Sequence, residues 1–479
     1  MLLKKHCAIF VVVTIVIAVK RGGIGMNIIG LIGIIIGIAF LIFAAMKGYE
    51  TIYVIIPVVV LIALTNGLDI TTSWVTTTME GAAQYFTVLA PLLIAGMLFA
   101  GIFSISGAAK AIALGLLKFF EKIFKPKAGK EVNTGIWVTV VVITVVSSFF
   151  AYVGMDGMVV IVTIYPIALQ MLKRYNVPRR CLPVLFYMNI WSMALPYSVG
   201  TTNVVTSQIL GTDLGCAAVP AIIGAVVTLI LELIYVTTYM KRIARSGEGF
   251  QAMPEYDMEM DESVKLPNFI LAVIPFVLIF VLALVLKWNM SICLIIGTVV
   301  EILLFIPQLK ATARIKNVKF MDVLKENMNH QAVFGVQITC IVVLLVGYSA
   351  VIRETPVFNS LITAMTTGSG VTLYIMCAIA MMIAVLMCVN PVAGMLTNLG
   401  VIAPYFIEAG VPAAAVHRMS IVASTVFDSL PTAAGIMLAH KLTGVKMKDG
   451  YGPVFVVTVC FTFLNMVIVT TLSALGVGV

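Results

Sequence analysis

Two short stretches of sequence decide the fold. Residues 194–203 read ALPYSVGTTN, and residues 426–435 read VFDSLPTAAG. They lie in the segments 181–210 and 413–441, which are apolar at their ends and polar in the middle. Because proline removes a backbone donor and glycine lowers helix propensity, each stretch predicts a helix that is interrupted near its centre. Irregular backbone at membrane depth persists only where protein or a wet cavity surrounds it.

The composition indicates that such a membrane setting applies to the whole chain. Its 479 residues are 61% hydrophobic and 11% charged, whereas soluble domains are about half apolar and about a quarter charged. So large an apolar excess cannot be hidden in a water-soluble core, and lipid must cover much of the surface. The formal net charge of +9 does not indicate a nucleic-acid partner. Lys and Arg lie between apolar blocks, as they do in cytoplasmic loops.

Cysteine and histidine predict no metal or cofactor. The eight cysteines stand singly without a CxxC pair, and the four histidines have no metal-ligand spacing. Glycines near the N-terminus lack the strand and helix context of a nucleotide fingerprint. We therefore expect buried thiols, with no zinc site, no disulfide framework and no cofactor.

Apolar segments long enough to cross a bilayer recur along the chain. A span needs roughly 20 apolar residues. Spans are predicted near 27–46, 51–66, 87–106, 217–240, 266–286, 290–308, 333–352 and 452–475, and further apolar arms at 134–152, 157–172, 372–389 and 393–407. The chain is thus predicted to be an all-α polytopic membrane protein.

The basic residues give the orientation of these spans. If 134–172 and 372–407 are re-entrant hairpins that enter and leave on one side, the basic clusters all fall on the same side, which is then the cytoplasm. Two full crossings in place of each hairpin would give the same parity. The clusters are 110–130, 173–180, 241–245, 310–325 and 441–448. The C-terminus is expected outside, and the protein in the inner (cytoplasmic) membrane.

The two halves of the chain have prolines at matching positions. Prolines 166, 178 and 196 of the first half recur at 404, 412 and 431 in the second, at nearly constant separation. Each half has an amphipathic stretch (71–86 and 320–332), a span, a hairpin and a broken helix, in that order. The hairpins open from opposite sides, so the repeats have inverted topology. Inverted repeats with discontinuous helices are the signature of secondary transporters, whose site lies near the midplane.

The predicted domain boundaries follow from these repeats. Residues 1–25 form an N-terminal extension or short hydrophobic segment, with Met26 as an alternative start. The first transmembrane repeat is 26–245, the linker loop is 246–265, and the second repeat is 266–479.

Polar side chains at the breaks and hairpin tips are the candidates to bind a solute. Half-helix N-termini carry partial positive charge that suits a carboxylate, and neighbouring hydroxyl and amide groups can hydrogen-bond a polar solute. Capping of the half-helices is the alternative role. The candidate substrate-binding residues are Ser198, Thr201, Thr202 and Asn203 in the first half and Asn390, Thr397, Asn398, Ser429 and Thr432 in the second.

Asp156 and Asp428 are the acidic residues of these polar elements, and they are the candidates for proton coupling. An intramembrane carboxylate is costly and indicates function by default. The structural alternative is an Asp that accepts backbone hydrogen bonds at a turn or at a helix start.

Other charged residues receive structural roles. We expect packing or interfacial roles for Glu232 and Glu301. His417 and Arg418, at the outer start of the second broken segment, are expected to be interfacial anchors, with an anion vestibule as the alternative.

The motifs resemble a known family. YPIALQMLKRYNVPRRCLPV (165–184), ALPYSVGTTNVVTSQILGTDLG (194–215) and FDSLP (427–431) resemble the gluconate:proton symporter (GntP) family, and most closely its hydroxybutyrate-permease-like branch. The resemblance covers about residues 26–475. It implies proton-coupled uptake of small hydroxy-carboxylates such as gluconate or 3-hydroxybutyrate, in a fold of the ion transporter superfamily that is commonly dimeric. By motif, the family's acidic residue in the last broken helix falls on Asp428, and its polar break falls on 198–203.

Two departures from the family pattern lie where ligands are expected. Thr432-Ala433 stands where the family often has Pro-His or a similar polar pair, and the second hairpin has Met395-Leu396-Thr397-Asn398 where the family is often rich in Ser and Gly. The substrate can therefore differ from those the family is named for.

The function predicted from the sequence is proton symport of a small organic anion, with no enzyme activity. Sodium coupling and anion exchange remain open as alternatives. An anion channel lacks a ring of basic pore residues, and a membrane enzyme lacks a visible nucleophile with its base.

Overall fold

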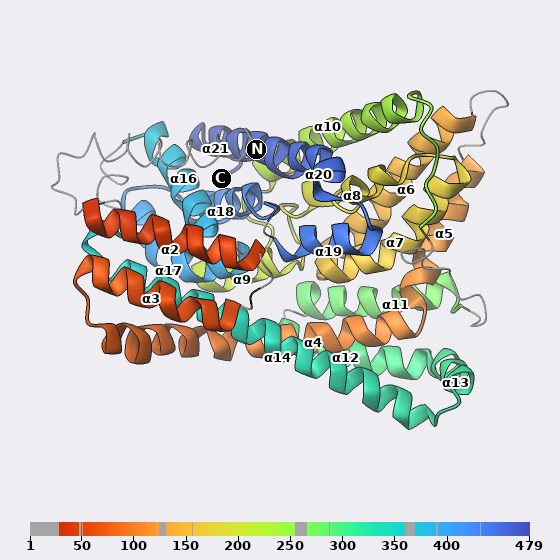
Figure 1. The fold of residues 1–479 in the computed structure, drawn as a ribbon, viewed down its shortest axis with the longest axis horizontal. Helices are drawn as coiled ribbons and strands as arrows, with labels where there is room; N and C mark the ends of the chain where they lie inside the picture. The colour runs from red at the N-terminus through yellow and green to blue at the C-terminus, as the bar shows by residue number, and fades with distance from the viewer. Residues whose placement is uncertain are drawn as a thin grey trace.

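The structure is a computed structural model that describes residues 28–46, 49, 51–123, 131–155, 157–253, 266–286, 288–358, 360, 369–388, 391–431 and 433–479. Over these residues the regular secondary structure is helical, without a strand (Figure 1). The prediction of an all-α fold is confirmed.

The first half of the chain contains the two outer helices, the first hairpin and the first broken segment. Its elements are α2 (Ile28–Met46), α3 (Thr51–Asn66), the π-helical η1 (Thr72–Thr78), α4 (Met79–Ile105), α5 (Ala108–Ile123), α6 (Glu131–Tyr152), α7 (Gly157–Arg174), η2 (Arg179–Cys181), α8 (Leu182–Leu185), η3 (Ile190–Ser192), α9 (Thr201–Leu210) and α10 (Ala218–Ala244).

The second half contains α11 to α21, among them the second hairpin and the second broken segment. Its elements are α11 (Phe269–Phe280), η4 (Val281–Val285), α12 (Met290–Leu304), α13 (Ile306–Ile315), α14 (Phe320–Arg353), α16 (Val371–Cys388), α17 (Pro391–Glu408), α18 (Ala413–Val426), α19 (Ala434–Thr443), α20 (Met447–Phe455), η5 (Val456–Cys460) and α21 (Phe461–Ala474).

Several of these helices can cross a membrane. By length and composition, four helices among the described residues are long and apolar enough, and there are up to six if each of two bent pairs is one span. The bends are 52° between Thr72–Thr87 and Leu89–Ile105, and 67° between Met290–Leu304 and Ile306–Ile315. The chain is thus a multi-pass membrane protein.

The structure has more helix than the sequence predicts, both in two basic clusters and in the stretch before one span. The basic clusters 110–130 and 310–325, predicted to be loops, overlap α5 and α13. Helix α5 forms because apolar residues recur at helical spacing, so that Ile112 is buried while Lys118 is exposed. The amphipathic stretch 320–332 continues directly into its span as the single 34-residue helix α14.

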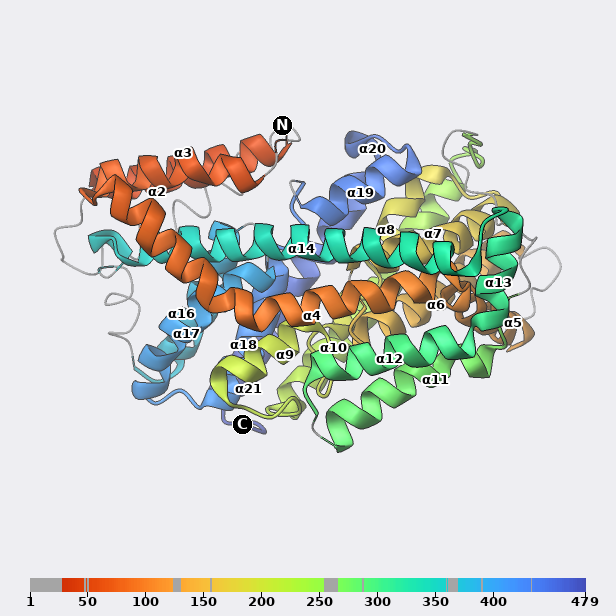
Figure 2. The ribbon, with the colours of Figure 1, turned by 90° about the horizontal axis from the view of Figure 1, so that it is seen from below.

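Helices α4 and α14 run along one another through the molecule (Figure 2). Two hydrophobic cores flank them. One contains the second hairpin, α16 and α17, together with α2, α3 and α18. The other contains the first hairpin, α6 and α7, together with α8, α11 and parts of α10 and α12.

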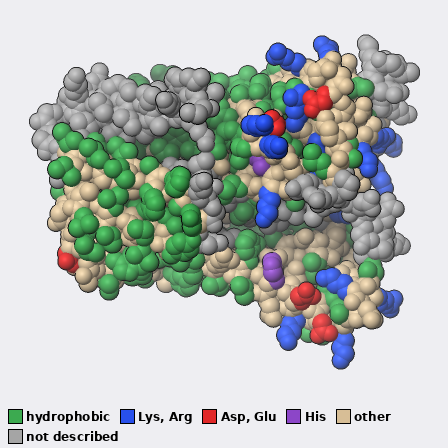
Figure 3. Space-filling model, in the orientation of Figure 1, with side chains coloured by type: hydrophobic (Ala, Val, Ile, Leu, Met, Phe, Trp, Pro, Cys, Tyr) green, Lys and Arg blue, Asp and Glu red, His purple; other side chains and the backbone are tan. Residues whose placement is uncertain are grey.

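The surface separates charge from apolar side chains. Figure 3 shows Lys and Arg gathered on the right-hand half of the view, over α13 and near the end of α10, while hydrophobic side chains cover the opposite half over α2 and α3. Exposed apolar residues on α2 include Ile32, Ile36 and Phe40.

Candidate functional site

The second part of each broken segment packs on the opposite half of the protein. Helix α9, from the first half, lies against α17 and α18, whereas α19, from the second half, lies against α7 and α8. Val205 of α9 is therefore part of the core around the second hairpin. Ile436 and Ala439 of α19 are part of the core around the first hairpin. This exchange of half-helices interlocks the two polar breaks.

The first arms of the two broken segments differ in regularity. In the first half, residues 179–200 form only the short pieces η2, α8 and η3 with turns between them, although a helical arm was expected. Aromatic side chains and Asn dominate 186–191 (FYMNIW), and such residues are poor helix formers. In the second half, α18 is a continuous helix of 14 residues that begins with three alanines.

The tip of the first hairpin is bonded to the first break. The main-chain N–H of Val199 donates to the carbonyl of Tyr152 at 3.1 Å, and the Tyr152 hydroxyl donates to the carbonyl of Pro196 at 3.0 Å. Gly154 has a φ of +87°, and a Cβ built on it would lie 2.8 Å from the Val199 carbonyl oxygen. Glycine is required there for both reasons, so hairpin and break form one structure.

Asn203 is the centre of a buried polar network in α9. Its Nδ2 donates to the carbonyls of Ser198 at 2.7 Å and Leu214 at 3.3 Å. Its Oδ1 lies 2.8 Å from His417 Nε2 and 3.2 Å from Arg418 Nη1. An amide offers two donors and one oxygen with two lone pairs, so each of these positions has a partner inside the protein.

The histidine in this network links the two halves through both ring nitrogens. Since the Asn203 oxygen accepts, Nε2 of His417 donates to it, and Nδ1 of the neutral ring accepts from the Thr212 hydroxyl at 2.6 Å. Thr212 follows the C-terminal end of α9. His417 on α18 therefore joins the beginning and the end of the exchanged half-helix.

The expected interfacial anchor role of His417 and Arg418 is wrong, whereas for Glu232 and Glu301 burial fits the packing role and contradicts the interfacial one. His417 and Arg418 are fully buried on α18, as are Glu232 on α10 and Glu301 on α12. The carboxyl oxygens of both glutamates have no hydrogen-bond partner among the described residues. Every residue of α18 from Ala415 to Val426 is buried. In the sequence, His417, Ser420 and Ser424 recur at helical spacing and form a polar face, which is typical of a helix exposed on one side. That pattern explains why the sequence did not place His417 and Arg418 inside.

The predicted ligands of the first half lie at the break. Ser198 is buried, with its Oγ 3.3 Å from the Tyr152 carbonyl and 3.2 Å from the Gly200 N–H. Thr201 and Thr202 are half-buried in the first turn of α9. Gly200 at the N-cap provides no side-chain cap, so this helix start keeps donors for a ligand.

The predicted ligands of the second half are only partly described. Ser429 is buried, and its carbonyl accepts from the Tyr451 hydroxyl at 3.0 Å. The main chain of Thr397 and Asn398 lies in α17. Asn390, Thr432 and Asp156 lie outside the described residues. Ala433, the N-cap residue of α19, provides no side-chain cap, so the second half-helix also begins with uncapped donors.

Asp428 lies in the second break, half-buried between α18 and α19. It interacts electrostatically with Tyr187, which comes from the first half. The Tyr187 hydroxyl lies beside the start of α19, where a Cβ on Gly435 would be 3.3 Å from it. The second break thus combines a carboxyl group, a buried phenol and a half-helix N-terminus.

No family model matches the chain. The chain is 22% identical to the uncharacterized transporter YxjC of Bacillus subtilis (strain 168) over 505 aligned positions, which cover 93% of this chain and 99% of that protein. Among solved structures, the Alcanivorax borkumensis YdaH transporter, described as having an unusual topology, matches with a TM-score of 0.38 and 13% identity over 84% of this chain and 88% of that one. The sequence similarity to YxjC supports transport as the class of function.

Proposed function

We propose that the protein is a secondary active transporter that imports a small organic anion together with protons. The observation that carries this proposal is the exchange of α9 and α19. It interlocks two interrupted helices from different halves, and one of the two breaks contains Asp428. Interrupted helices at membrane depth form solute sites in secondary transporters because their free backbone groups replace water.

The anion would be bound by the starts of the two half-helices. Uncapped N–H groups in the first turns of α9 and α19 carry partial positive charge. The hydroxyls of Thr201, Thr202 and Ser429 would add hydrogen bonds. The Ser198 hydroxyl donates to the Tyr152 carbonyl in this conformation and would have to exchange that bond for one to the anion. Asn203 has all of its hydrogen-bonding positions occupied, so in this conformation it holds the first break in place. The remaining candidates, Asn390, Thr397, Asn398 and Thr432, belong to the second half of the same proposed site.

Asp428 would bind the coupling proton. An ionised carboxyl that is partly removed from water is costly unless it is compensated, and a neighbouring anionic solute adds repulsion. Protonation removes both costs, so proton and anion would be taken up together. Asp156, at the tip of the first hairpin, is the second candidate for this role.

The order of elements supports the inverted-repeat architecture. Two helices, a long helix, a hairpin, a broken segment and a final span occur in α2 to α10 and again in α11 to α21, apart from α5, which follows the long helix, and α13, which precedes it. The resemblance to the gluconate:proton symporter family supports a hydroxy-carboxylate as the solute and the inner membrane as the location. The hairpins and broken segments would move against a scaffold of the remaining helices, which would also form a homodimer surface.

Uptake into proteoliposomes tests the proposal. Purified protein is supplied with a panel of small hydroxy acids, with a pH gradient and a sodium gradient imposed separately. We expect accumulation driven by the pH gradient. Accumulation driven by sodium alone would replace the proton with sodium, and transport that is independent of both gradients would contradict symport.

A matched pair of variants tests Asp428. Asp428→Asn is expected to abolish pH-driven accumulation, whereas Asp69→Asn, in the exposed loop before η1, is expected to keep it. Asp69 accepts a hydrogen bond from the Thr72 N–H at 2.6 Å and lies outside the breaks. Accumulation that persists in Asp428→Asn would remove this residue from the coupling role.

A further inference from the structure

Two buried arginines connect the halves in opposite directions. Arg179, in η2 of the first half, donates from Nε to the carbonyl of Thr443 at 2.7 Å. Thr443 is the last residue of α19, which belongs to the second half. Arg418, in α18 of the second half, donates from Nε to the carbonyl of Cys216 at 2.7 Å and from Nη2 to the carbonyl of Leu214. Both of these carbonyls follow the end of α9, which belongs to the first half.

Each arginine is placed to hold its contact. Arg179 is 1% exposed and Arg418 is fully buried. Nη2 of Arg179 also donates to the Tyr165 hydroxyl at 2.9 Å, which ties the side chain to α7. Nη1 of Arg418 donates to the Ala194 carbonyl at 3.3 Å as well as to Asn203. A buried guanidinium is tolerated only when its donors are satisfied, so these side chains have little freedom to move.

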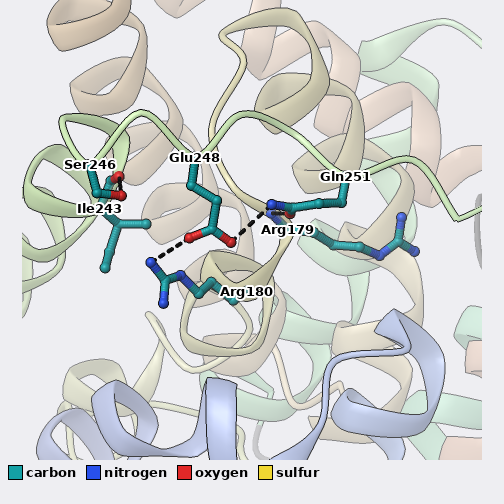
Figure 4. Close-up of polar contacts among 6 residues, drawn as sticks. All are labelled: Arg179, Arg180, Ile243, Ser246, Glu248 and Gln251. Carbon is teal, nitrogen blue, oxygen red and sulfur yellow. Dashed lines mark hydrogen bonds and ion pairs between the residues drawn. The ribbon is translucent and has the colours of Figure 1, made fainter.

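The neighbouring arginine shows that this arrangement is specific to Arg179. Figure 4 shows Arg180 directed toward Glu248 in the loop after α10, while the guanidinium of Arg179 points away from that loop. Arg180 and Glu248 form a 2.5 Å ion pair with exposed fractions of 34% and 36%. The main-chain N–H of Arg179 donates to Gln251 Oε1 in this loop at 3.2 Å.

Helix electrostatics explains the partner of Arg179, because the Thr443 carbonyl ends α19. The carbonyls that Arg418 contacts beyond α9 lie in the loop that follows it, and there the need of buried backbone for hydrogen bonds explains the choice. The C-terminal end of a helix carries partial negative charge and unsatisfied carbonyls. The acceptors of Arg418 are main-chain carbonyls and one amide oxygen. These groups are neutral, and the guanidinium satisfies backbone that hydrocarbon would leave unpaired.

We propose that Arg179 and Arg418 are a pair of positioning residues, the crossed arginines, each of which fixes the C-terminal end of the half-helix contributed by the other half. With their C-terminal ends fixed, α9 and α19 keep their first turns in a constant relation to each other. The consequence for solute binding rests on the proposed function: the crossed arginines would set the geometry of the two helix starts that bind the anion.

Hydrogen exchange measured by mass spectrometry on the purified full-length protein tests the anchoring without any transport assay. Arg418→Gln is expected to speed exchange in 201–216 about tenfold or more, and Arg179→Gln to do the same in 434–445, because each loses charge-assisted hydrogen bonds. Arg180→Gln and Ser420→Ala are the matched controls and should leave both segments at wild-type rates. The Ser420 hydroxyl is buried on α18 and has no hydrogen-bond partner among the described residues.

The half in which hydrogen exchange becomes faster decides whether the arginines act as anchors. Faster exchange confined to the substituted residue's own half, or no change, would overturn the anchoring. If a Gln variant does not fold, Arg418→Lys and Arg179→Lys replace it, with the same crossed pattern expected at a smaller amplitude because Lys keeps the charge and loses the fork of donors.

Uptake kinetics test the consequence for the site. The Lys variants are expected to raise the KM for the transported acid severalfold while the maximal rate changes less, and Arg180→Gln to leave both unchanged. A crossed exchange pattern with an unchanged KM would overturn the link to solute binding. A crossed pattern in a protein that transports no organic anion would contradict the proposed function and leave the anchoring standing.

Discussion

The two broken segments have prolines at matching positions, but their backbone groups find hydrogen-bond partners in different ways. In the second half, α18 is regular to Val426, and its backbone groups bond within the helix. In the first half, 179–200 is mostly irregular, and its backbone groups need other partners. The regular arm supplies one of them, since Arg418 of α18 donates to the carbonyl of Ala194 and, beyond α9, to that of Leu214. An irregular break is therefore stable because its counterpart is regular.

The breaks also differ in whether their polar side chains are already bonded within the protein. Around the first break, Asn203 uses all of its hydrogen-bonding positions within the protein. The second break retains Asp428, which lies half-buried beside Tyr187. Under the proposed function, the first break would be a fixed framework, and the second would provide the group that binds the proton.

The largest expected effect comes from removing the centre of the framework. Asn203→Ala leaves Arg418 and His417 with unpaired buried groups, which should lower the free energy of unfolding by about 3 kcal/mol or more. Thr201→Ala, two residues earlier and half-buried, should lower it by less than about 1 kcal/mol. Thermal melting of the purified proteins measures both. Equal losses would contradict the special role of Asn203.

Gly154→Ala is expected to cause the next largest loss of stability. It places a side chain at a left-handed φ and against the Val199 carbonyl, which should cost about 1–3 kcal/mol. Gly157→Ala, at the start of α7, is the control, because a Cβ there meets nothing within 4 Å. Melting and uptake should both report the difference, and a Gly154 variant that behaves like the Gly157 variant would show that tip and break are not joined.

A pair of tyrosine variants compares the two breaks directly. Tyr152→Phe and Tyr451→Phe each remove one hydrogen bond, to the carbonyls of Pro196 and Ser429 respectively. Both should lower stability by about 1 kcal/mol. Only Tyr451→Phe should shift the pH profile of uptake, because its bond lies next to Asp428. A shift of the same size in Tyr152→Phe would contradict the division between framework and titrating break.

The smallest effect is expected at the loop that joins the halves. Glu248→Gln removes the ion pair with Arg180, and both side chains are about one-third exposed. Such pairs contribute about 0–1 kcal/mol, and salt screens them. Melting at low and high salt should therefore show a small difference that disappears at high salt. A large, salt-independent loss would indicate that the loop is part of the framework.

Helix positions were predictable because apolar runs and prolines mark them. The hairpin arm predicted at 157–172 is α7, Gly157–Arg174, and Pro412, one of the repeated prolines, directly precedes α18. The hydrogen-bond partners of buried side chains were less predictable. Arg418 bonds carbonyls about two hundred positions away, and a carbonyl carries no side-chain signal. The exchange of half-helices leaves no local pattern either, since α9 and α19 would read the same whichever hairpin they contacted.

That exchange also sets an order of events during synthesis. The core around the first hairpin includes Ile436 and Ala439 of α19, and the carbonyl that Arg179 requires lies 264 residues further along the chain. We therefore expect the first half to enter the bilayer before the residues that complete its core, and before the carbonyl that Arg179 contacts, have been made. It completes its own core only when nearly the entire second half has been translated, so neither half is an independent folding unit.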